Sequence, residues 1–185
     1  MRVTAAIGVV VVSLLTALAR PAAPVTASVP TTPYYGNDAQ QTTVPGPHPE
    51  EVVWTDLLGP TYGPMAYAMA DDYGLPHWLV RNLIWVESKG DPGAASETAD
   101  HGLMQLNDNT WPTLAERLSL EDPNPYDVSH NLQMGMFLLA SLHAKYGDWT
   151  MALTAYNRGE TGMLRLLEQT GSADSDYSRN VMEGR

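Results

Sequence analysis

The sequence predicts a mostly α-helical domain, and three features support this prediction. Apolar residues recur three and four positions apart, which is the spacing of one face of a helix. Glycines stand where these segments end, as at Gly90, Gly147 and Gly159. Alternating strand patterns are missing, although the run 103–106 could be extended. We therefore expect packed helices with at most a short extended segment.

Each of the longer predicted helices has its own start or stop signal. Pro64 and Pro76 stand in the first turn of two segments, where the missing N–H of proline costs nothing. Asp148 is a candidate N-cap, and Gly74 is a candidate stop. The longer predicted helices are 63–74, 75–90, 127–147 and 148–159, and the shorter ones are 110–118, 161–169 and 174–183.

Composition and charge limit the function. The chain has 185 residues, of which 44% are hydrophobic, and this is enough for one domain with its own core. The formal net charge is −11, which argues against nucleic acid as a partner because its phosphates must be neutralised by cations. The sequence contains no cysteine, and His, Asp and Glu do not cluster at metal-ligand spacing. We expect neither metal nor cofactor.

Residues 1–27 are typical of a secretory signal. A short basic start precedes an apolar run from Ala5 to Ala19, which is shorter than the roughly 20 residues of a membrane-spanning helix. An uncleaved membrane anchor is the alternative. Residues 28–49 are rich in Pro and Thr and are predicted to form a tether, followed by a domain at 50–185. We expect the domain outside the cytoplasm, either secreted, periplasmic, wall-associated or membrane-anchored.

Glu87 lies on an otherwise apolar stripe of the helix predicted at 75–90. Burial and the C-terminal end of the helix dipole both disfavour its charge, so its pKa should be raised. A carboxylic acid that stays protonated near neutral pH can protonate a leaving-group oxygen. The alternative is a glutamate that reaches solvent from the last turn or pairs with an arginine. The stripe consists of Val80, Leu83, Ile84 and Glu87.

The segment "DHGLMQLNDNTW", residues 100–111, is rich in neutral amides. Gly102 allows close approach of the backbone, and Gln105 and Asn107 supply amide donors and acceptors. Amides suit hydroxyl and acetamido groups better than they suit ions. The alternative is a capped turn that opens the helix at Thr110.

The segment "ALTAYNRG" ends in two polar residues. Tyr156 and Asn157 come at the end of a predicted helix, where side chains can leave the packed face. They are candidates for ligand contact. The alternative is a tyrosine in the core and an asparagine that caps the helix.

The segments "VES", "GLMQ" and "AYNRG", in this order and at these separations, resemble the lytic transglycosylases that have a soluble-lytic-transglycosylase domain. The segments "HNLQMGMFLL" and "YSRNVM" extend the resemblance, which covers roughly Tyr62 to Met182. It implies a lysozyme-like single domain of packed helices. It also implies cleavage of the bond between N-acetylmuramic acid and N-acetylglucosamine in peptidoglycan, with formation of a 1,6-anhydro ring and without a cofactor.

The resemblance also implies roles for single residues. Glu87 matches the single catalytic residue, which acts as an acid and then as a base. Ser88 would hold the carboxylate or the sugar, and Tyr156 would orient the acid. The other expected substrate-binding residues are Gly102, Met104, Gln105, Asn107, Asn157 and Tyr177.

One departure from the family leaves the reaction open. After "GLMQL" this chain has Asn107 and Asp108, where the family often has Met-Pro, and the surrounding segment is also similar to that of animal-type lysozymes. Asp100 is therefore a candidate second carboxylate that directs water, as in a hydrolytic lysozyme (muramidase). A non-catalytic wall-binding module is a third alternative. Glycan strands are the expected partner, a secretion or conjugation apparatus is a further candidate, and a monomer is the default expectation.

Overall fold

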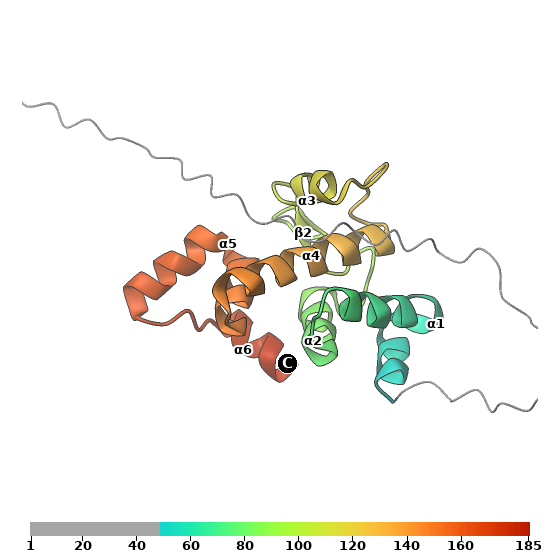
Figure 1. The fold of residues 1–185 in the computed structure, drawn as a ribbon, viewed down its shortest axis with the longest axis horizontal. Helices are drawn as coiled ribbons and strands as arrows, with labels where there is room; N and C mark the ends of the chain where they lie inside the picture. Colours follow the sequence, from blue (N-terminus) through green and yellow to red (C-terminus); the bar gives the residue numbers. More distant parts are fainter. Residues whose placement is uncertain (1–48) are drawn as a thin grey trace, which may run out of the picture. The chain divides into compact units, whose positions relative to one another are not determined.

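Six helices and one short hairpin make up residues 49–185, which are the residues that the computed structural model describes, with side chains from Trp54 onward (Figure 1). The predicted signal segment, 1–27, and all but the last residue of the predicted tether, 28–49, lie outside the described residues. The elements are α1 (Pro49–Asp72), α2 (His77–Ser88), β1 (Asp100–His101), β2 (Leu106–Asn107), α3 (Trp111–Leu118), α4 (Val128–Tyr146), α5 (Trp149–Thr170) and α6 (Asp176–Glu183).

The prediction of a mostly helical domain is confirmed. The helices α2, α3, α4 and α6 begin and end within two residues of the predicted bounds. Asp148 caps α5, because its carboxylate accepts a hydrogen bond from the backbone N–H of Met151 at 2.8 Å. No helix of residues 49–185 is both long enough and apolar enough to span a membrane.

Two glycines divide long helices into pieces. Gly159 has φ 69° and ψ 160° inside α5, so the predicted stop and the predicted helix 161–169 are both present. Gly59 has φ 76° and ψ 174° inside α1, and the helix piece before it was not predicted. Trp54, Leu57 and Leu58 of that piece stand at helical spacing, a signal that the prediction did not use. The piece is stabilised by tertiary packing, since Trp54 is only 1% exposed.

The hairpin forms at a different place from the predicted extended run, 103–106. Asp100 pairs with Asn107 and His101 pairs with Leu106 in an antiparallel register. Residues 102–105 are the connecting turn, so only Leu106 of the predicted run lies in a strand. The residues of this run are apolar because the turn is buried. The side chains of Leu103 and Met104 are 1% and 0% exposed.

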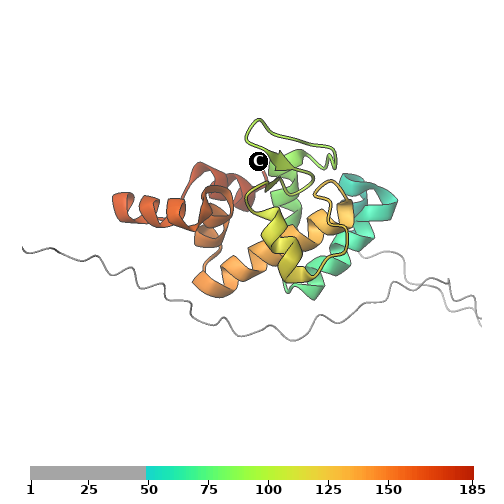
Figure 2. The ribbon, with the colours of Figure 1, turned by 90° about the horizontal axis from the view of Figure 1, so that it is seen from above.

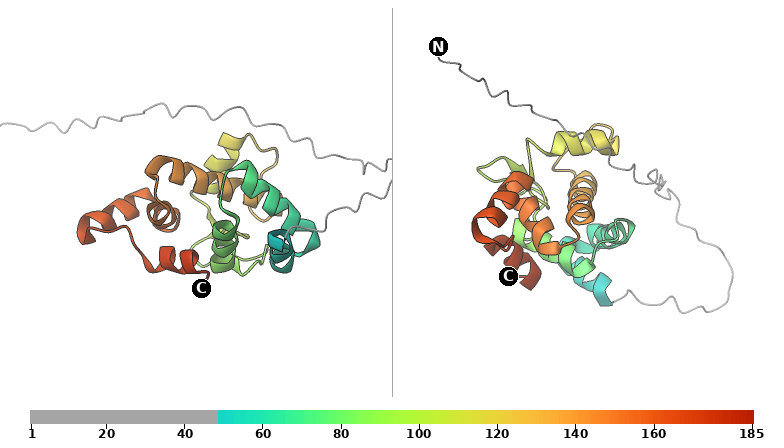
Figure 3. Two further views of the ribbon diagram at one scale, coloured as in Figure 1. Left: turned by 60° about the horizontal axis from the view of Figure 1, so that its bottom comes forward. Right: turned by 60° about the vertical axis from the view of Figure 1, so that its left-hand side comes forward.

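Helix α4 crosses the middle of the domain and contacts α1, α3 and α5 (Figures 1 and 2). Helix α2 packs between α1 and α6, and α6 also contacts α5. The second piece of α5 lies at the end of the domain away from α1 (Figure 3). The largest core cluster is built mainly from α1, α2 and α4, and includes the fully buried side chains of Leu79, Leu83, Leu132 and Met136.

The turn at 102–105 is held against α4 by two close fits. A Cβ at Gly102, where φ is +72°, would lie 2.5 Å from the Asn131 amide nitrogen. A Cβ at Gly135 would lie 2.4 Å from the sulfur of Met104. Buried Asn131 accepts from the Met104 N–H at 2.8 Å and donates to the carbonyl oxygens of His101 and Pro125. These contacts fix the turn of the hairpin against α4.

Candidate active site

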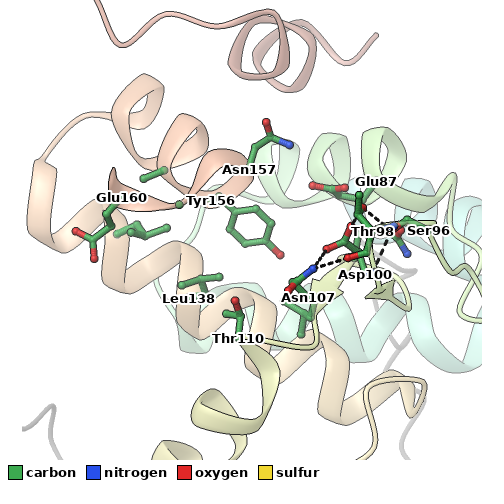
Figure 4. Close-up of a pocket in the computed structure, with 15 residues that line it drawn as sticks. Glu87, Ser96, Thr98, Asp100, Asn107, Thr110, Leu138, Tyr156, Asn157 and Glu160 are labelled. Carbon is green, nitrogen blue, oxygen red and sulfur yellow. Dashed lines mark hydrogen bonds between the residues drawn. The ribbon is translucent and has the colours of Figure 1, made fainter. Parts of the chain in front are cut away.

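A pocket of about 750 Å³ opens between the hairpin, α4 and α5, and Glu87 lies at one end of it (Figure 4). The hairpin side supplies mostly polar groups, α4 supplies two leucines, and α5 supplies Tyr156 together with the polar side chains of Asn157 and Glu160. The lining residues are Glu87, Ser96, Thr98, Asp100, Gln105, Leu106, Asn107, Thr110, Leu138, Leu142, Ala155, Tyr156, Asn157, Gly159 and Glu160.

Glu87 stands in the last turn of α2, with Ile84 one turn before it fully buried. Burial raises the pKa of Glu87 to about 7, a hydrogen bond from Tyr177 opposes this rise, and the negative charge of Asp100 adds to it. A carboxyl group with this pKa carries its proton on about half of the molecules at neutral pH. It can therefore act first as an acid and then as a base.

Tyr177 donates a hydrogen bond from its hydroxyl to Oε1 of Glu87. Two features hold Tyr177 in this position. Ser175 caps α6 through a capping box with Ser178, and the Asn82 amide donates to the Val181 carbonyl at 2.9 Å, which ties α6 to α2. Burial, followed by the charge of Glu87, raises the pKa of Tyr177 well above its usual value, so the hydroxyl keeps its proton.

Tyr156 lines the pocket, but it does not make the hydrogen bond to the acid that its predicted orienting role suggests. Its hydroxyl donates to the Met104 carbonyl at 2.8 Å, so it is committed to the turn at 102–105. Tyr177, which was predicted only as a substrate-binding residue, makes the bond to Glu87 instead. The 90 residues between Glu87 and Tyr177 explain why the sequence could not show which tyrosine reaches the acid.

Ser88, the predicted contact of the carboxylate or the sugar, is not among the residues that line the pocket. Its side chain is buried, and its hydroxyl donates to the Leu103 carbonyl at 2.9 Å and accepts from the Gly90 N–H at 3.2 Å. A serine that follows Glu87 on a helix points about 100° away from it, since one turn takes 3.6 residues. Ser88 therefore joins the end of α2 to the hairpin turn.

The hairpin residues divide into two groups. Gln105 and Asn107 line the pocket. Gly102 and Met104 do not line the pocket, and instead lie against α4. Gln105 has φ 46°, and its amide nitrogen donates to the Gly102 carbonyl at 2.9 Å. Its position is thus fixed by the turn itself.

Asp100 lies in the same pocket as Glu87 and is held by three side chains (Figure 4). Ser96 and Thr98 donate to Oδ2 at 2.7 and 2.5 Å, and Asn107 donates to Oδ1 at 2.8 Å. Burial pushes the pKa of Asp100 up, but these hydrogen bonds and the neighbouring His101 outweigh it and hold the pKa below the usual value. Asp100 is therefore a carboxylate at neutral pH.

Nine of the fifteen lining residues were not predicted as site residues, among them Ser96, Thr98 and Glu160. Ser96 and Thr98 alternate with Asp100 in "SETAD", and this alternation was the available signal for a shared side-chain cluster. Glu160 lies at the opposite end of the pocket from Glu87, with Tyr156 between them (Figure 4). Asn157, which was predicted, is exposed and lines the pocket.

Glu160 takes part in an ion pair with the end of α4. The ammonium of Lys145 and the hydroxyl of Tyr146 both donate to Oε2 of Glu160. The hydrogen bonds from Lys145 and Tyr146 lower the pKa of Glu160. In residues 49–185, no group of three or more His, Asp or Glu side chains is arranged to hold a metal ion.

Comparisons with known proteins agree with the resemblance seen in the sequence. A transglycosylase of Enterobacteria phage PRD1 is 36% identical over 106 residues, which cover 57% of this chain and 35% of that protein. Membrane-bound lytic murein transglycosylase F of Desulfosudis oleivorans is 32% identical over 107 residues, which cover 54% of this chain and 22% of that protein.

The fold is similar to a solved structure of an inactive mutant of lytic transglycosylase Slt from Pseudomonas aeruginosa. The TM-score is 0.59 at 19% identity, over 69% of this chain and 24% of that chain. This chain therefore spans about a third or less of the length of each of these proteins. Residues 64–178, which are more than half of the chain, match the family described as transglycosylase SLT domain. The chain belongs to the transglycosylase SLT domain family.

Proposed function

We propose that this protein is a lytic transglycosylase that cleaves the β-1,4 bond between N-acetylmuramic acid and N-acetylglucosamine in peptidoglycan. The observation that carries the proposal is Glu87, a carboxyl group with a pKa of about 7 at one end of a pocket lined by neutral amides. The names of the relatives, murein transglycosylase among them, support the choice of substrate.

In the first step, Glu87 donates its proton to the bridging oxygen, and the bond from this oxygen to C1 of N-acetylmuramic acid breaks. Burial supports this step because it keeps the proton on the carboxyl group near neutral pH. The positive charge that develops at C1 is stabilised by the acetamido group of the same sugar. This is substrate assistance, one of the exceptions to the two-carboxylate rule.

In the second step, the ionised Glu87 takes the proton of the C6 hydroxyl while that oxygen attacks C1. A 1,6-anhydro ring forms, the carboxyl group is protonated again, and no water is consumed. Tyr177 supports this step because its hydroxyl donates to Glu87 and stabilises the carboxylate form. Gln105, Asn107 and Asn157 supply amides for the sugar hydroxyl and acetamido groups.

A hydrolytic lysozyme is the second candidate, and Asp100 is the observation that favours it. It lies in the same pocket and is ionised, so it could direct a water at C1. Both of its oxygens already accept hydrogen bonds from Ser96, Thr98 and Asn107, which leaves less capacity for a water. For this reason we favour ring closure.

The test is a digest of purified sacculi with the full chain, followed by mass analysis of the muropeptides. We expect products that are lighter by one water and have no reducing end. Products of full mass with a reducing end would identify a lysozyme. Binding to sacculi without release of any product would identify a wall-binding module.

Peptidoglycan lies outside the cytoplasm, and we therefore propose that the protein acts there, either secreted, periplasmic or attached to the wall or membrane. Relatives named as membrane-bound and relatives from phages support an extracytoplasmic role without choosing among these. Fractionation of cells that express the full chain tests this proposal. Activity confined to the cytoplasm would contradict it.

A further inference from the structure

The hairpin carries a second cluster of side chains, which lies outside the pocket lining. His101 of β1 has its Nδ1 2.8 Å from the Tyr126 hydroxyl and its Nε2 2.8 Å from Oδ1 of Asp108. The indole N–H of Trp111 donates to the same Oδ1 at 3.1 Å. We call His101, Asp108, Trp111 and Tyr126 the hairpin clasp. None of the four is among the residues that line the pocket.

The hydrogen bonds of the clasp run in one direction. Hydrogen bonds from Trp111 and His101 lower the pKa of Asp108, so Asp108 is a carboxylate at neutral pH and can only accept. The Nε2 of His101 must therefore carry a proton and donate the hydrogen bond. In a neutral imidazole the other nitrogen, Nδ1, is then an acceptor, and the Tyr126 hydroxyl donates to it. Both ring nitrogens of His101 are thus engaged.

The clasp holds together the two strands of a very short hairpin. The strands β1 and β2 have two residues each, and so small a ladder is marginal by itself. The Asp108 N–H extends the ladder by one step, because it donates to the Ala99 carbonyl at 3.0 Å. His101 lies on the first strand and Asp108 directly after the second. Trp111 begins α3 and Tyr126 lies shortly before α4, so the clasp also ties the hairpin to the chain at both helices.

The same two strands carry Asp100 and Asn107 of the pocket. Successive side chains of a strand point to opposite faces, and the residue after each of these two belongs to the clasp. The amide of Asn107 donates to Oδ1 of Asp100 and to the Thr98 carbonyl, both at 2.8 Å (Figure 4). The amide oxygen of Asn107 accepts from the backbone N–H and the amide of Asn109. These bonds depend on the register of the two strands, which the clasp holds from the other face.

The hydrogen bond from Asn107 limits what Asp100 can do in the reaction. While Asn107 donates to Oδ1, and Ser96 and Thr98 donate to Oδ2, the carboxylate has little capacity left for a water. Without Asn107, Oδ1 could accept from a water next to C1 of the sugar. After the bond from C1 to the bridging oxygen breaks, the oxygen of this water would bond to C1, and Asp100 would take the released proton. The product would then have a reducing end in place of an anhydro ring.

We propose that the hairpin clasp keeps Asn107 bound to Asp100 and thereby favours ring closure over attack by water. His101 and Asp108 are positioning residues in this role, because they act through Asn107 and do not line the pocket. A loosened clasp would free Asp100 to direct a water, as in a hydrolytic lysozyme. The inference rests on the proposed function, and it adds a part of the fold that selects between the two possible products.

The experiment is a digest of sacculi with the full chain, and its readout is the ratio of reducing to anhydro muropeptides. His101→Phe removes both hydrogen bonds of the ring and keeps an aromatic ring next to Tyr126, whose ring centroid lies 5.1 Å away. Asp108→Leu removes the acceptor that His101 and Trp111 share. We expect each variant to raise the ratio roughly tenfold, as for one lost hydrogen bond to a charged group. A merely structural role would lower both products together and leave the ratio unchanged.

Two further variants serve as controls. Asp108→Asn keeps an oxygen that can accept from His101 and Trp111, so its ratio should stay close to that of wild type. His77→Phe removes a matched pair, His77–Asp71, which has the same 2.8 Å distance. The side chains of that pair are 14% and 65% exposed, against 15% and 57% for His101 and Asp108. His77 does not line the pocket, so His77→Phe should leave the ratio unchanged. Melting curves check that every variant is folded.

Amide hydrogen exchange tests the clasp without turnover. The Asp108 N–H, which crosses the hairpin to the Ala99 carbonyl, should exchange faster in His101→Phe than in wild type or in His77→Phe. Unchanged exchange in His101→Phe would overturn the inference and leave the proposed function intact. So would an unchanged product ratio in both clasp variants, or an equal rise of the ratio in His77→Phe. Wild-type digests that contain only reducing products would overturn the proposed function, and the inference with it.

Discussion

The two ends of the pocket hold the same type of side chain in opposite states. Glu87 is largely buried, with a pKa raised to about 7. Glu160 is 44% exposed and accepts from Lys145 and Tyr146, whose hydrogen bonds lower its pKa. Burial dominates at the first site and hydrogen bonding to a cation dominates at the second. The surroundings of a glutamate, rather than its chemical type, therefore decide whether it can move a proton.

The difference also explains why only one of the two glutamates suits acid catalysis. Glu87 accepts from a neutral hydroxyl, which orients the carboxyl group without removing its ability to hold a proton. Glu160 accepts from a cation, which stabilises the carboxylate and makes it a poor proton donor near neutral pH. The predictions below test this contrast in order of expected effect.

The largest effect is expected for activity at the buried glutamate. Glu87→Gln removes the proton donor at nearly constant volume and should lower kcat roughly 10²- to 10⁴-fold, as for loss of a general acid. Release of muropeptides from sacculi measures it, and binding to sacculi should persist. Glu160→Gln is the matched change at the other end and should lose far less. Substantial activity in Glu87→Gln would move the acid elsewhere, most directly to Asp100.

The second effect concerns stability and its dependence on pH. The pKa of Glu87 is about 7 in the folded chain, above its ordinary value of 4.5, so its carboxylate form opposes folding. The contribution of Glu87 to the stability of the wild-type protein should be greatest below pH 4.5 and should fall as pH rises through 7. Glu87→Gln has no such loss. The free energy of unfolding of this variant minus that of wild type should therefore be about 3 kcal/mol larger at pH 8 than at pH 4.

Urea unfolding at both pH values measures this difference. A constant gap between the two proteins would mean that Glu87 is not held in a low-dielectric site. Glu160→Gln should show no such gain at pH 8.

The third effect is expected at Tyr177. Its hydrogen bond lowers the pKa of Glu87, so Tyr177→Phe should raise that pKa and move the alkaline limb of the pH profile to higher pH. The value of kcat should fall roughly tenfold, because one hydrogen bond to a charged group is lost. Profiles of kcat and of kcat/KM between about pH 5 and 9, a range that spans the pKa of a tuned acid, measure both effects. A limb that stays in place would show that Tyr177 acts on packing alone.

The fourth effect has the opposite sign. The charge of Asp100 raises the pKa of Glu87, so Asp100→Asn should move the alkaline limb to lower pH. If Asp100 acts only through its charge, the anhydro products should persist in this variant. Loss of all turnover in Asp100→Asn, with the hairpin still folded, would instead favour Asp100 as a second carboxylate.

The smallest effect is expected for stability at the exposed glutamate. Hydrogen bonds from Lys145 and Tyr146 lower the pKa of Glu160, so its contribution is present above its ordinary pKa and disappears as pH falls. Because the pair is half exposed, Glu160→Gln should cost no more than about 1 kcal/mol at neutral pH, and less in high salt. Thermal melts at two salt concentrations measure this cost. A loss of stability in Glu160→Gln as large as the pH-dependent difference expected for Glu87→Gln would contradict the contrast between the two ends of the pocket.

The helices could be predicted because their signals are local. The glycine stops at Gly147 and Gly159 and the cap at Asp148 act within one or two turns, and the structure has them where they were expected. The hairpin was not recognised, because strands of two residues have no periodicity to show. The first piece of α1 was not predicted, although Trp54, Leu57 and Leu58 stand at helical spacing.

By itself, the sequence determined the helical domain, the breaks at Gly147 and Gly159 and the carboxyl group on an apolar stripe, since each depends on residues close together in the chain. Tertiary structure alone decided that Tyr177 reaches Glu87, that Ser88 turns away from the pocket, and that Glu160 faces Lys145. These contacts depend on how α6, the hairpin and the second piece of α5 pack. Packing is set by close fits between distant residues, such as Met104 against Gly135, which no local pattern records.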